Sequence, residues 1–279
     1  MIRASAADRP EIVAFLRDHL ATAIFPLSNL HRHGMAGGHP RAMTFWLRRQ
    51  ARVISDLLAV TQEGMIFPNC PTHPWDACRS ALAGRAIIGM LGDDRQVTGL
   101  RQALGLEAAA GHVVTEPHYQ LDLAALVMPD VTGFTLRPIA AAPRDLVIGW
   151  RRDYLVQTMM MQGEDIDGTA IRDIDAYIAA DSHYVLFAGD TPVAMTGFNA
   201  SLPDTVQIGG VYTPPDLRGR GLARRALALH LARVRAAGVT QAVLFAATIE
   251  AARAYEAIGF IRIGDFGIAM CDIPQVVHG

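Results

Sequence analysis

The residues with the clearest chemical meaning are arginines and glycines packed into one short segment. It reads Arg218-Gly219-Arg220-Gly221-Leu222-Ala223. Glycine permits positive φ and leaves the neighbouring backbone N–H groups unshielded. A helix that begins after such a loop presents unpaired N–H donors and the positive end of its dipole. With two arginines beside it, this segment predicts a seat for a phosphate or a pyrophosphate.

Two common phosphate-binding motifs do not match this segment. A Walker loop requires Gly-Lys-Ser/Thr, and the chain contains no lysine. A dinucleotide-binding fingerprint requires Gly-x-Gly-x-x-Gly, but the third glycine after Gly219 and Gly221 is replaced by Arg224. Both nucleotide classes are therefore disfavoured.

The flanking sequence predicts a strand before the loop and a long helix after it. Val206, Ile208 and Val211 suit a strand. Two prolines follow and end it, because proline cannot donate to a strand ladder. Beyond Gly221 the apolar residues recur at helical spacing as far as Gly238, a residue type typical of helix ends.

The pattern Arg-x-x-Gly-x-Ala, from Arg218 to Ala223, resembles the acyl-coenzyme A loop of the GCN5-related N-acetyltransferases (GNAT), which is Gln/Arg-x-x-Gly-x-Gly/Ala. The surroundings resemble the family too, with a strand at 242–246, a second helix and the run Tyr255 to Phe260. The resemblance covers roughly 133–273. It implies an α/β fold with a mixed, mostly antiparallel twisted sheet flanked by helices, and acetyl-CoA as the cofactor.

The resemblance also implies which residues hold the cofactor: Val211, Tyr212, Thr213, Arg218, Gly219, Arg220, Gly221, Leu222, Ala223 and Thr248. The pantetheine amides are expected to pair with the open edge of the strand 211–213. A backbone N–H at Val211 or Tyr212 is the expected oxyanion donor. Thr248 stands where the family often has asparagine, and whether its shorter hydroxyl reaches the pantetheine stays open.

Tyr255 is the expected general acid. A tyrosine phenol has an ordinary pKa of about 10, so it carries a proton at neutral pH and can give it to the departing sulfur. The alternative is a tyrosine that only packs in the core. The general base stays open among Glu164, Asp165, His183 and His230, with a water chain as the alternative.

Three other groups of residues have weaker claims. Met159 to Met161 either line an apolar acceptor pocket or fill the core. His31 to His33 could face the acceptor from the other half of the chain. Cys70, His73 and Cys78 could bind zinc, but their spacing matches no common zinc motif, so we expect buried thiols and no metal.

The first half of the chain looks like a degenerate copy of the second. Ile2-Arg3 corresponds to Leu136-Arg137, and the order of expected elements is similar. The first copy has Cys70 to Pro74 in place of the glycine loop, and its prolines remove N–H donors. We therefore expect a degenerate GNAT-like domain at 1–130 and a catalytic GNAT domain at 131–279.

The expected elements of the two halves are as follows. The first half has helices at 42–47, 75–82 and 95–104, and strands at 53–60, 65–69, 85–90 and 119–123. The second half has helices at 144–161 and 171–180, an acidic loop at 163–168, and strands at 184–188 and 192–199.

Composition sets the limits on function. The chain has 279 residues, 51% of them hydrophobic, and a net charge of −2, which gives no electrostatic case for nucleic acid or a membrane. With three cysteines and no apolar leader, we expect a cytoplasmic protein. The expected function is acetyl transfer to the primary amine of a small acceptor, with a homodimer left open. The alternatives are a non-catalytic acyl-CoA sensor and an aminoacyl-tRNA-dependent acyltransferase.

Overall fold

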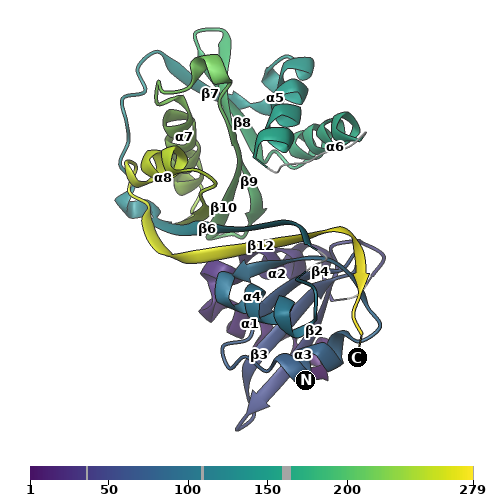
Figure 1. Cartoon of the computed structure of the whole chain (residues 1–279). Helices are drawn as coiled ribbons and strands as arrows, with labels where there is room; N and C mark the ends of the chain where they lie inside the picture. Colours follow the sequence, from purple (N-terminus) through teal and green to yellow (C-terminus); the bar gives the residue numbers. More distant parts are fainter. Residues whose placement is uncertain (36, 108–109, 159–164, 279) are drawn as a thin grey trace. The chain divides into compact units, whose positions relative to one another are not determined.

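The computed structural model describes residues 1–35, 37–107, 110–158 and 165–278. The chain forms two compact units (Figure 1). The first contains 1–118 and 264–279, and the second contains 119–263. The division therefore differs from the expected join at 130/131, since residues 119–130 lie with the second unit and the last segment lies with the first. Within the described ranges, no helix is both long and apolar enough to cross a membrane.

The first unit is a mostly antiparallel sheet with helices. Its strands are ordered β1-β2-β3-β4-β5-β12, and β4 and β5 are parallel. The elements are β1 (Ile2–Arg3), α1 (Arg9–Asp18), α2 (Leu20–His33), β2 (Met43–Gln50), β3 (Val53–Thr61), β4 (Met65–Asn69), α3 (Trp75–Leu82), β5 (Ala86–Asp93), α4 (Asp94–Ala103), the start of β6 (Ala110–Asp122) and most of β12 (Ile261–Val276).

One expected helix of the first half is wrong. We expect a helix at 42–47, but Met43–Gln50 forms β2, which pairs with β3 from Met43↔Thr61 to Gln50↔Val53 with one register shift. Thr44, Phe45 and Trp46 are residue types that favour strands. In so short an apolar run the sequence alone does not separate the two periods, and pairing with β3 decides the outcome.

The second unit repeats the same architecture. Its strands are ordered β6-β11-β10-β9-β8-β7, and β10 and β11 are parallel. The elements are β7 (Phe134–Pro138), α5 (Arg144–Gln157), α6 (Ile166–Ala179), β8 (His183–Ala188), β9 (Thr191–Ser201), β10 (Thr205–Tyr212), α7 (Leu222–Ala236), β11 (Gln241–Phe245) and α8 (Ile249–Glu256). Helices α5 and α6 cover one face of the sheet and α7 covers the other (Figure 1).

The helices before β8 differ from their expected bounds. Helix α5 ends at Gln157 rather than at 161, and α6 begins at Ile166 rather than at 171. The expected acidic loop at 163–168 is therefore partly helix. Asp167 lies in the first turn of α6, where a carboxylate is favoured by the helix dipole. Residues 159–164, with Met159 to Met161 and Glu164, lie outside the described residues.

The last strand of the chain completes the first unit. β12 runs antiparallel to β5, with pairs from Phe266↔Asp93 to Met270↔Gly89 and, after an irregularity, to Val276↔Ala86. Phe266 is buried in this unit, with its ring centroid 6.4 Å from that of Phe25 and 5.4 Å from that of His118. The sequence analysis did not predict this pairing.

Candidate functional site

The centre of the candidate site is an irregularity in β10. Gly209 pairs with Gly197 of β9, and Tyr212 pairs with Met195, so β10 contains one residue more than β9 over this stretch. This is a β-bulge, and it includes Gly210, whose φ is +64°. A bulge re-aims the backbone, and here it does so at Gly210 and Val211, beside the expected oxyanion donor.

Next to the bulge, β10 and β11 separate. Their registered pairs end at Gln207↔Val243, although β10 continues to Tyr212 and β11 to Phe245. The edge of β10 beyond Gln207 therefore carries backbone N–H and C=O groups that β11 does not pair. Such an edge can accept an extended ligand with amide groups, which is how the expected pantetheine contacts would form.

The glycine loop leads from this strand into α7. Gly219 and Gly221 have φ of +77° and +69°, values in the left-handed region. Gly221 is the N-cap of α7 and brings no capping side chain. Among the described residues, the N–H groups of Gly219 to Ala223 donate to no acceptor. The loop therefore presents free donors at the positive end of a helix dipole, as an anion requires.

The arginines of this region donate hydrogen bonds that hold the loop, and they also give it positive charge. Arg218 donates from Nε to the Thr213 carbonyl at 3.0 Å and from Nη2 to Gln157 Oε1 at 2.6 Å. Arg220 donates to the Asp216 carbonyl at 3.1 Å. Arg225 donates from Nη1 to the Arg220 carbonyl at 2.7 Å. These contacts fix the loop's carbonyl groups and leave its N–H groups available.

Tyr212 ends β10 with a buried phenol, 5% exposed, that donates to Asp153 Oδ2 of α5 at 3.1 Å. Burial, together with the carboxylate of Asp153, raises the pKa of Tyr212 to about 12. The phenol therefore stays protonated and ties the end of the strand to α5. The role expected for Tyr212 in cofactor binding involves its backbone, which this contact positions.

Tyr255 and Thr248 lie at opposite ends of α8. Tyr255 is 8% exposed and belongs to the apolar core that α7 and α8 form against the sheet. Thr248 is the N-cap of α8, and its Oγ1 accepts from the Ala251 N–H at 3.1 Å. The hydroxyl proton of Thr248 remains able to donate, so the expected pantetheine contact stays a prediction. The acid role of Tyr255 stays a prediction too.

The three described candidates for the general base are in different settings. Asp165 pairs with Arg172 at 2.6 Å on the surface. His230 lies on α7, where its ring stacks on Phe198 at 4.0 Å. His183 starts β8 and is fully buried, with Nε2 directed at the bulge residue Gly210. Only His183 is brought to the strand that carries the expected oxyanion donor.

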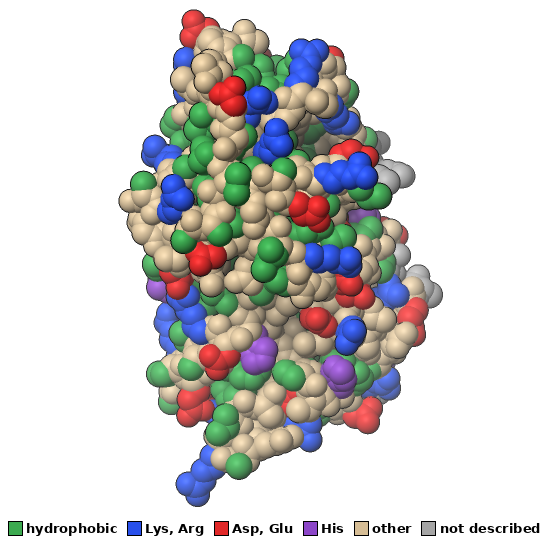
Figure 2. All heavy atoms as spheres, turned by 90° about the vertical axis from the view of Figure 1, so that its left-hand side faces the viewer, with side chains coloured by type: hydrophobic (Ala, Val, Ile, Leu, Met, Phe, Trp, Pro, Cys, Tyr) green, Lys and Arg blue, Asp and Glu red, His purple; other side chains and the backbone are tan. Residues whose placement is uncertain are grey.

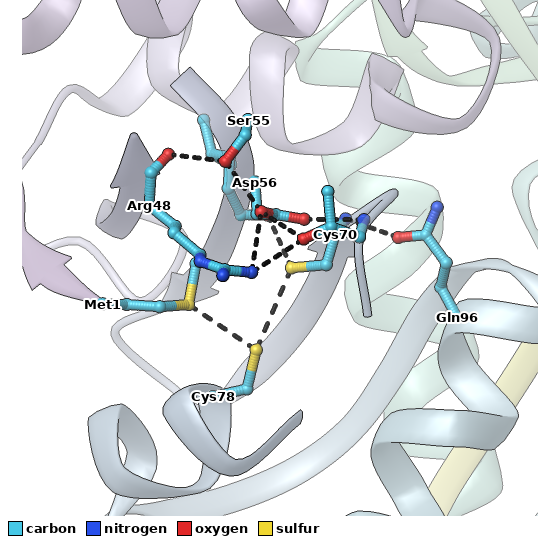
Figure 3. Close-up of polar contacts among 9 residues, drawn as sticks. Met1, Arg48, Ser55, Asp56, Cys70, Cys78 and Gln96 are labelled. Atoms are coloured by element: carbon cyan, nitrogen blue, oxygen red, sulfur yellow. Dashed lines mark hydrogen bonds and ion pairs between the residues drawn. The ribbon is translucent and has the colours of Figure 1, made fainter. Parts of the chain in front are cut away.

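The corresponding loop of the first unit is built differently. Its strand-to-helix loop is held by the buried Asp56, whose carboxylate accepts from the Thr72 N–H at 2.9 Å and from the Thr72 hydroxyl at 2.7 Å. Arg48 and Ser55 also contact this carboxylate (Figure 3). Helix α3 begins after Pro74, which has no N–H. A pyrophosphate there would meet a negative charge, which supports the expectation of a degenerate copy.

The three residues considered as zinc ligands lie in different settings. Cys70 Sγ and Cys78 Sγ lie 3.9 Å apart in the core, and Cys78 also contacts Met1 (Figure 3). His73 instead stacks on Trp75. No cluster of three or more His, Cys, Asp or Glu side chains with metal-binding proximity occurs in the part of the chain that the structure describes. His31 to His33 end α2 in the first unit, so their acceptor role stays a prediction.

The residues that build the bulge and hold the loop differ in how far the sequence signals them. The Gly209-Gly210 pair inside a strand is itself a bulge signal, because glycine in a strand interior often marks one. Gln157 and Asp153 carry no such signal. They are polar residues on an exposed helical face, and only the tertiary structure brings them to Arg218 and Tyr212.

Comparison with known proteins gives one family match. Residues 151–260 match the profile of the acetyltransferase (GNAT) family. This segment holds the bulge, the glycine loop and Tyr255, and its match confirms the predicted resemblance to that family. No curated protein matches the sequence.

Solved structures extend the likeness over the whole chain. A Drosophila protein from structural genomics is similar with a TM-score of 0.60 at 13% identity, over 96% of this chain and 97% of its own. A GCN5-related N-acetyltransferase from Sphaerobacter thermophilus gives 0.57 at 13%, over 100% and 96%. One from Kribbella flavida gives 0.52 at 19%, over 81% and 90%. These likenesses confirm the predicted fold class.

Proposed function

We propose that the second unit is an N-acetyltransferase that moves the acetyl group of acetyl-CoA to the primary amine of a small acceptor. The nitrogen attacks the thioester carbonyl and a tetrahedral intermediate forms. The C–S bond then breaks, the nitrogen loses a proton and the sulfur gains one. The products are an acetamide and free coenzyme A.

The observation that carries the proposal is the separation of β10 from β11 directly before an uncapped helix. The open edge supplies amide partners for pantetheine, and the N–H groups from Gly219 to Ala223 supply donors for the pyrophosphate. In this proposal the N–H of Val211 or Tyr212 stabilises the oxyanion, and Tyr255 protonates the leaving sulfur.

A screen of amines tests the proposal. The purified chain is incubated with acetyl-CoA and, in turn, L-lysine, spermidine, kanamycin and a peptide with a free N-terminal alanine. Release of coenzyme A thiol is measured against a reaction without amine. Amine-dependent release with at least one acceptor is expected. Binding of acetyl-CoA without any release would favour a non-catalytic sensor.

The charge distribution bears on the aminoacyl-tRNA alternative. Arginine and carboxylate side chains are mixed on the face of the molecule shown in Figure 2, and the net charge is −2. An RNA donor would be expected to contact a strongly basic groove. Salt-dependent RNA binding together with transfer from an aminoacyl-tRNA would nevertheless replace acetyl-CoA as the donor.

We also propose that the first unit is a degenerate copy that does not bind acyl-CoA. The bonds from Thr72 to Asp56 and the proline before α3 support this, because they occupy the Thr72 N–H, place a carboxylate at the loop and leave residue 74 without an N–H. We further propose that the protein is cytoplasmic.

A further inference from the structure

His183 has an unusual position for a buried histidine. It starts β8, is 0% exposed, and lies across the neighbouring strand β9 toward β10. Two glycines make room for it: a Cβ on Gly197 would overlap its ring, and one on Gly210 would lie 2.6 Å from its Nε2. The imidazole therefore lies next to the bulge at Gly210. This bulge is part of the edge of β10 that β11 does not pair.

The ring of His183 is held in place by its neighbours, but one of its nitrogens has no partner among the described residues. Its plane stacks on Tyr177 of α6, with ring centroids 3.4 Å apart and an angle of 10° between planes. Its Nδ1 lies 2.9 Å from the Ser182 hydroxyl. Its Nε2 is buried and has no hydrogen-bond partner within the described ranges. Leaving a buried polar atom unpaired costs about 1–3 kcal/mol, so the atom requires an explanation.

The charge state of the ring is settled by its surroundings. Burial holds the pKa of His183 well below its ordinary range, and the positive charge of Arg151 acts in the same direction. Arg151 is itself paired with Asp173, from Nε at 2.8 Å and from Nη2 at 2.6 Å. The ring is therefore a neutral imidazole at physiological pH, and it can offer a lone pair at Nε2 when Nδ1 donates to Ser182.

We propose that Nε2 of His183 accepts a hydrogen bond from the nitrogen of the acceptor amine and so orients it toward the thioester held at the β10 bulge. The proposal rests on the function proposed above. It assigns the first contact to the acceptor and selects one of the four base candidates for a binding role. The low basicity of His183 suits this role, because a weakly basic imidazole can accept a hydrogen bond from the amine without taking its proton.

Two substitutions separate this role from packing. H183F keeps a stacked ring and removes both ring nitrogens, the unpaired Nε2 and the Nδ1 that contacts the Ser182 hydroxyl. Removing the unpaired atom favours folding and losing the Ser182 contact opposes it, so we expect little change in Tm. For the amine that turns over fastest among L-lysine, spermidine, kanamycin and the alanyl peptide, we expect kcat/KM to fall roughly tenfold, as for one lost hydrogen bond. The KM for acetyl-CoA is expected to stay the same.

H183Q is the conservative variant, because its amide carries a polar atom close to the position of Nε2. It should recover part of the lost kcat/KM for the amine. H118F is the matched control: His118 is also a buried imidazole, 2% exposed, but it lies in the first unit beside Phe266. H118F should therefore leave kcat/KM for the amine within twofold of wild type, which corresponds to about 0.4 kcal/mol.

The outcomes are distinct. Wild-type kcat/KM for the amine in H183F, with the wild type active, overturns the role of His183 and leaves the proposed function standing. Equal losses in H183F and H183Q, with a lower Tm in both, show a packing role and overturn it as well. If the wild type releases no coenzyme A with any of the four amines, the proposed function fails and the assignment of His183 fails with it.

Discussion

At the scale of single residues, the proposed acid role of Tyr255 can be tested by removing the phenol oxygen alone. Replacing it with phenylalanine keeps the ring in the core that it shares with Phe260, whose centroid lies 6.1 Å away. We expect kcat to fall by about 10²-fold or more, the usual size of a lost general acid, with little change in the KM for acetyl-CoA. Steady-state kinetics measure this. An unchanged kcat would remove Tyr255 from the mechanism.

The burial of His230 leads to a prediction of how the stability of the chain depends on pH. Burial lowers its pKa to about 3 in the folded chain, with Arg233 acting in the same direction, against an ordinary value of 6.5. Between these values the unfolded chain binds more protons, so the neutral buried ring contributes stability above pH 6.5 that is lost as pH falls toward 3. The loss from this group is at most about 1.4 kcal/mol per pH unit.

H230F should therefore flatten the acid loss of stability. The charged or titratable groups nearest the ring are Arg233 of α7, and Tyr184 and His183 of β8. Urea midpoints at pH 7, 6 and 5 are compared for wild type and variant, which cancels the contribution of the carboxylates. Parallel curves for the two proteins would contradict the prediction.

At the scale of elements, the junction of β10 and α7 is the part that should control cofactor affinity. Gly221 has φ of +69°, and proline, fixed near −65°, cannot adopt it. G221P also removes one of the N–H groups at the start of α7. We expect acetyl-CoA binding to be lost in calorimetry. G189P is the control, since Gly189 has φ of +61° in the β8–β9 turn away from the loop. Equal affinity in wild type and G221P would refute the loop assignment.

The sequence predicts this junction well for a physical reason. Prolines, glycines and a change of apolar period are local signals, and they placed β10, the loop and α7 to within a few residues. The turn between β2 and β3, Ala51-Arg52, contains neither glycine nor proline, and there the pairing of β2 with β3 decides the structure. The position of His183 could not be predicted either, because it depends on Gly197 and Gly210 lying on two other strands.

At the scale of the whole molecule, the two units have similar strand orders but differ at the strand-to-helix loop. In each unit a parallel pair of strands lies next to this loop, β4 with β5 and β10 with β11. In the second unit the loop offers free N–H groups, whereas in the first Asp56 accepts from Thr72 and Pro74 precedes the helix. Similar architecture alone is therefore no evidence for a second cofactor site.

The last strand belongs to the first unit. This arrangement can be distinguished by experiment from a division of the chain near residue 130. Phe266 of β12 is 1% exposed and packs with Phe25 and His118, so F266A should cost about 3–5 kcal/mol. In hydrogen exchange, protection should fall in residues 1–118 and persist in 119–263. Ile273, on the same strand but 68% exposed, is the control, and I273A should change stability by about 0.5 kcal/mol or less. Loss of protection confined to 131–263 would show instead that the strand belongs with the second unit.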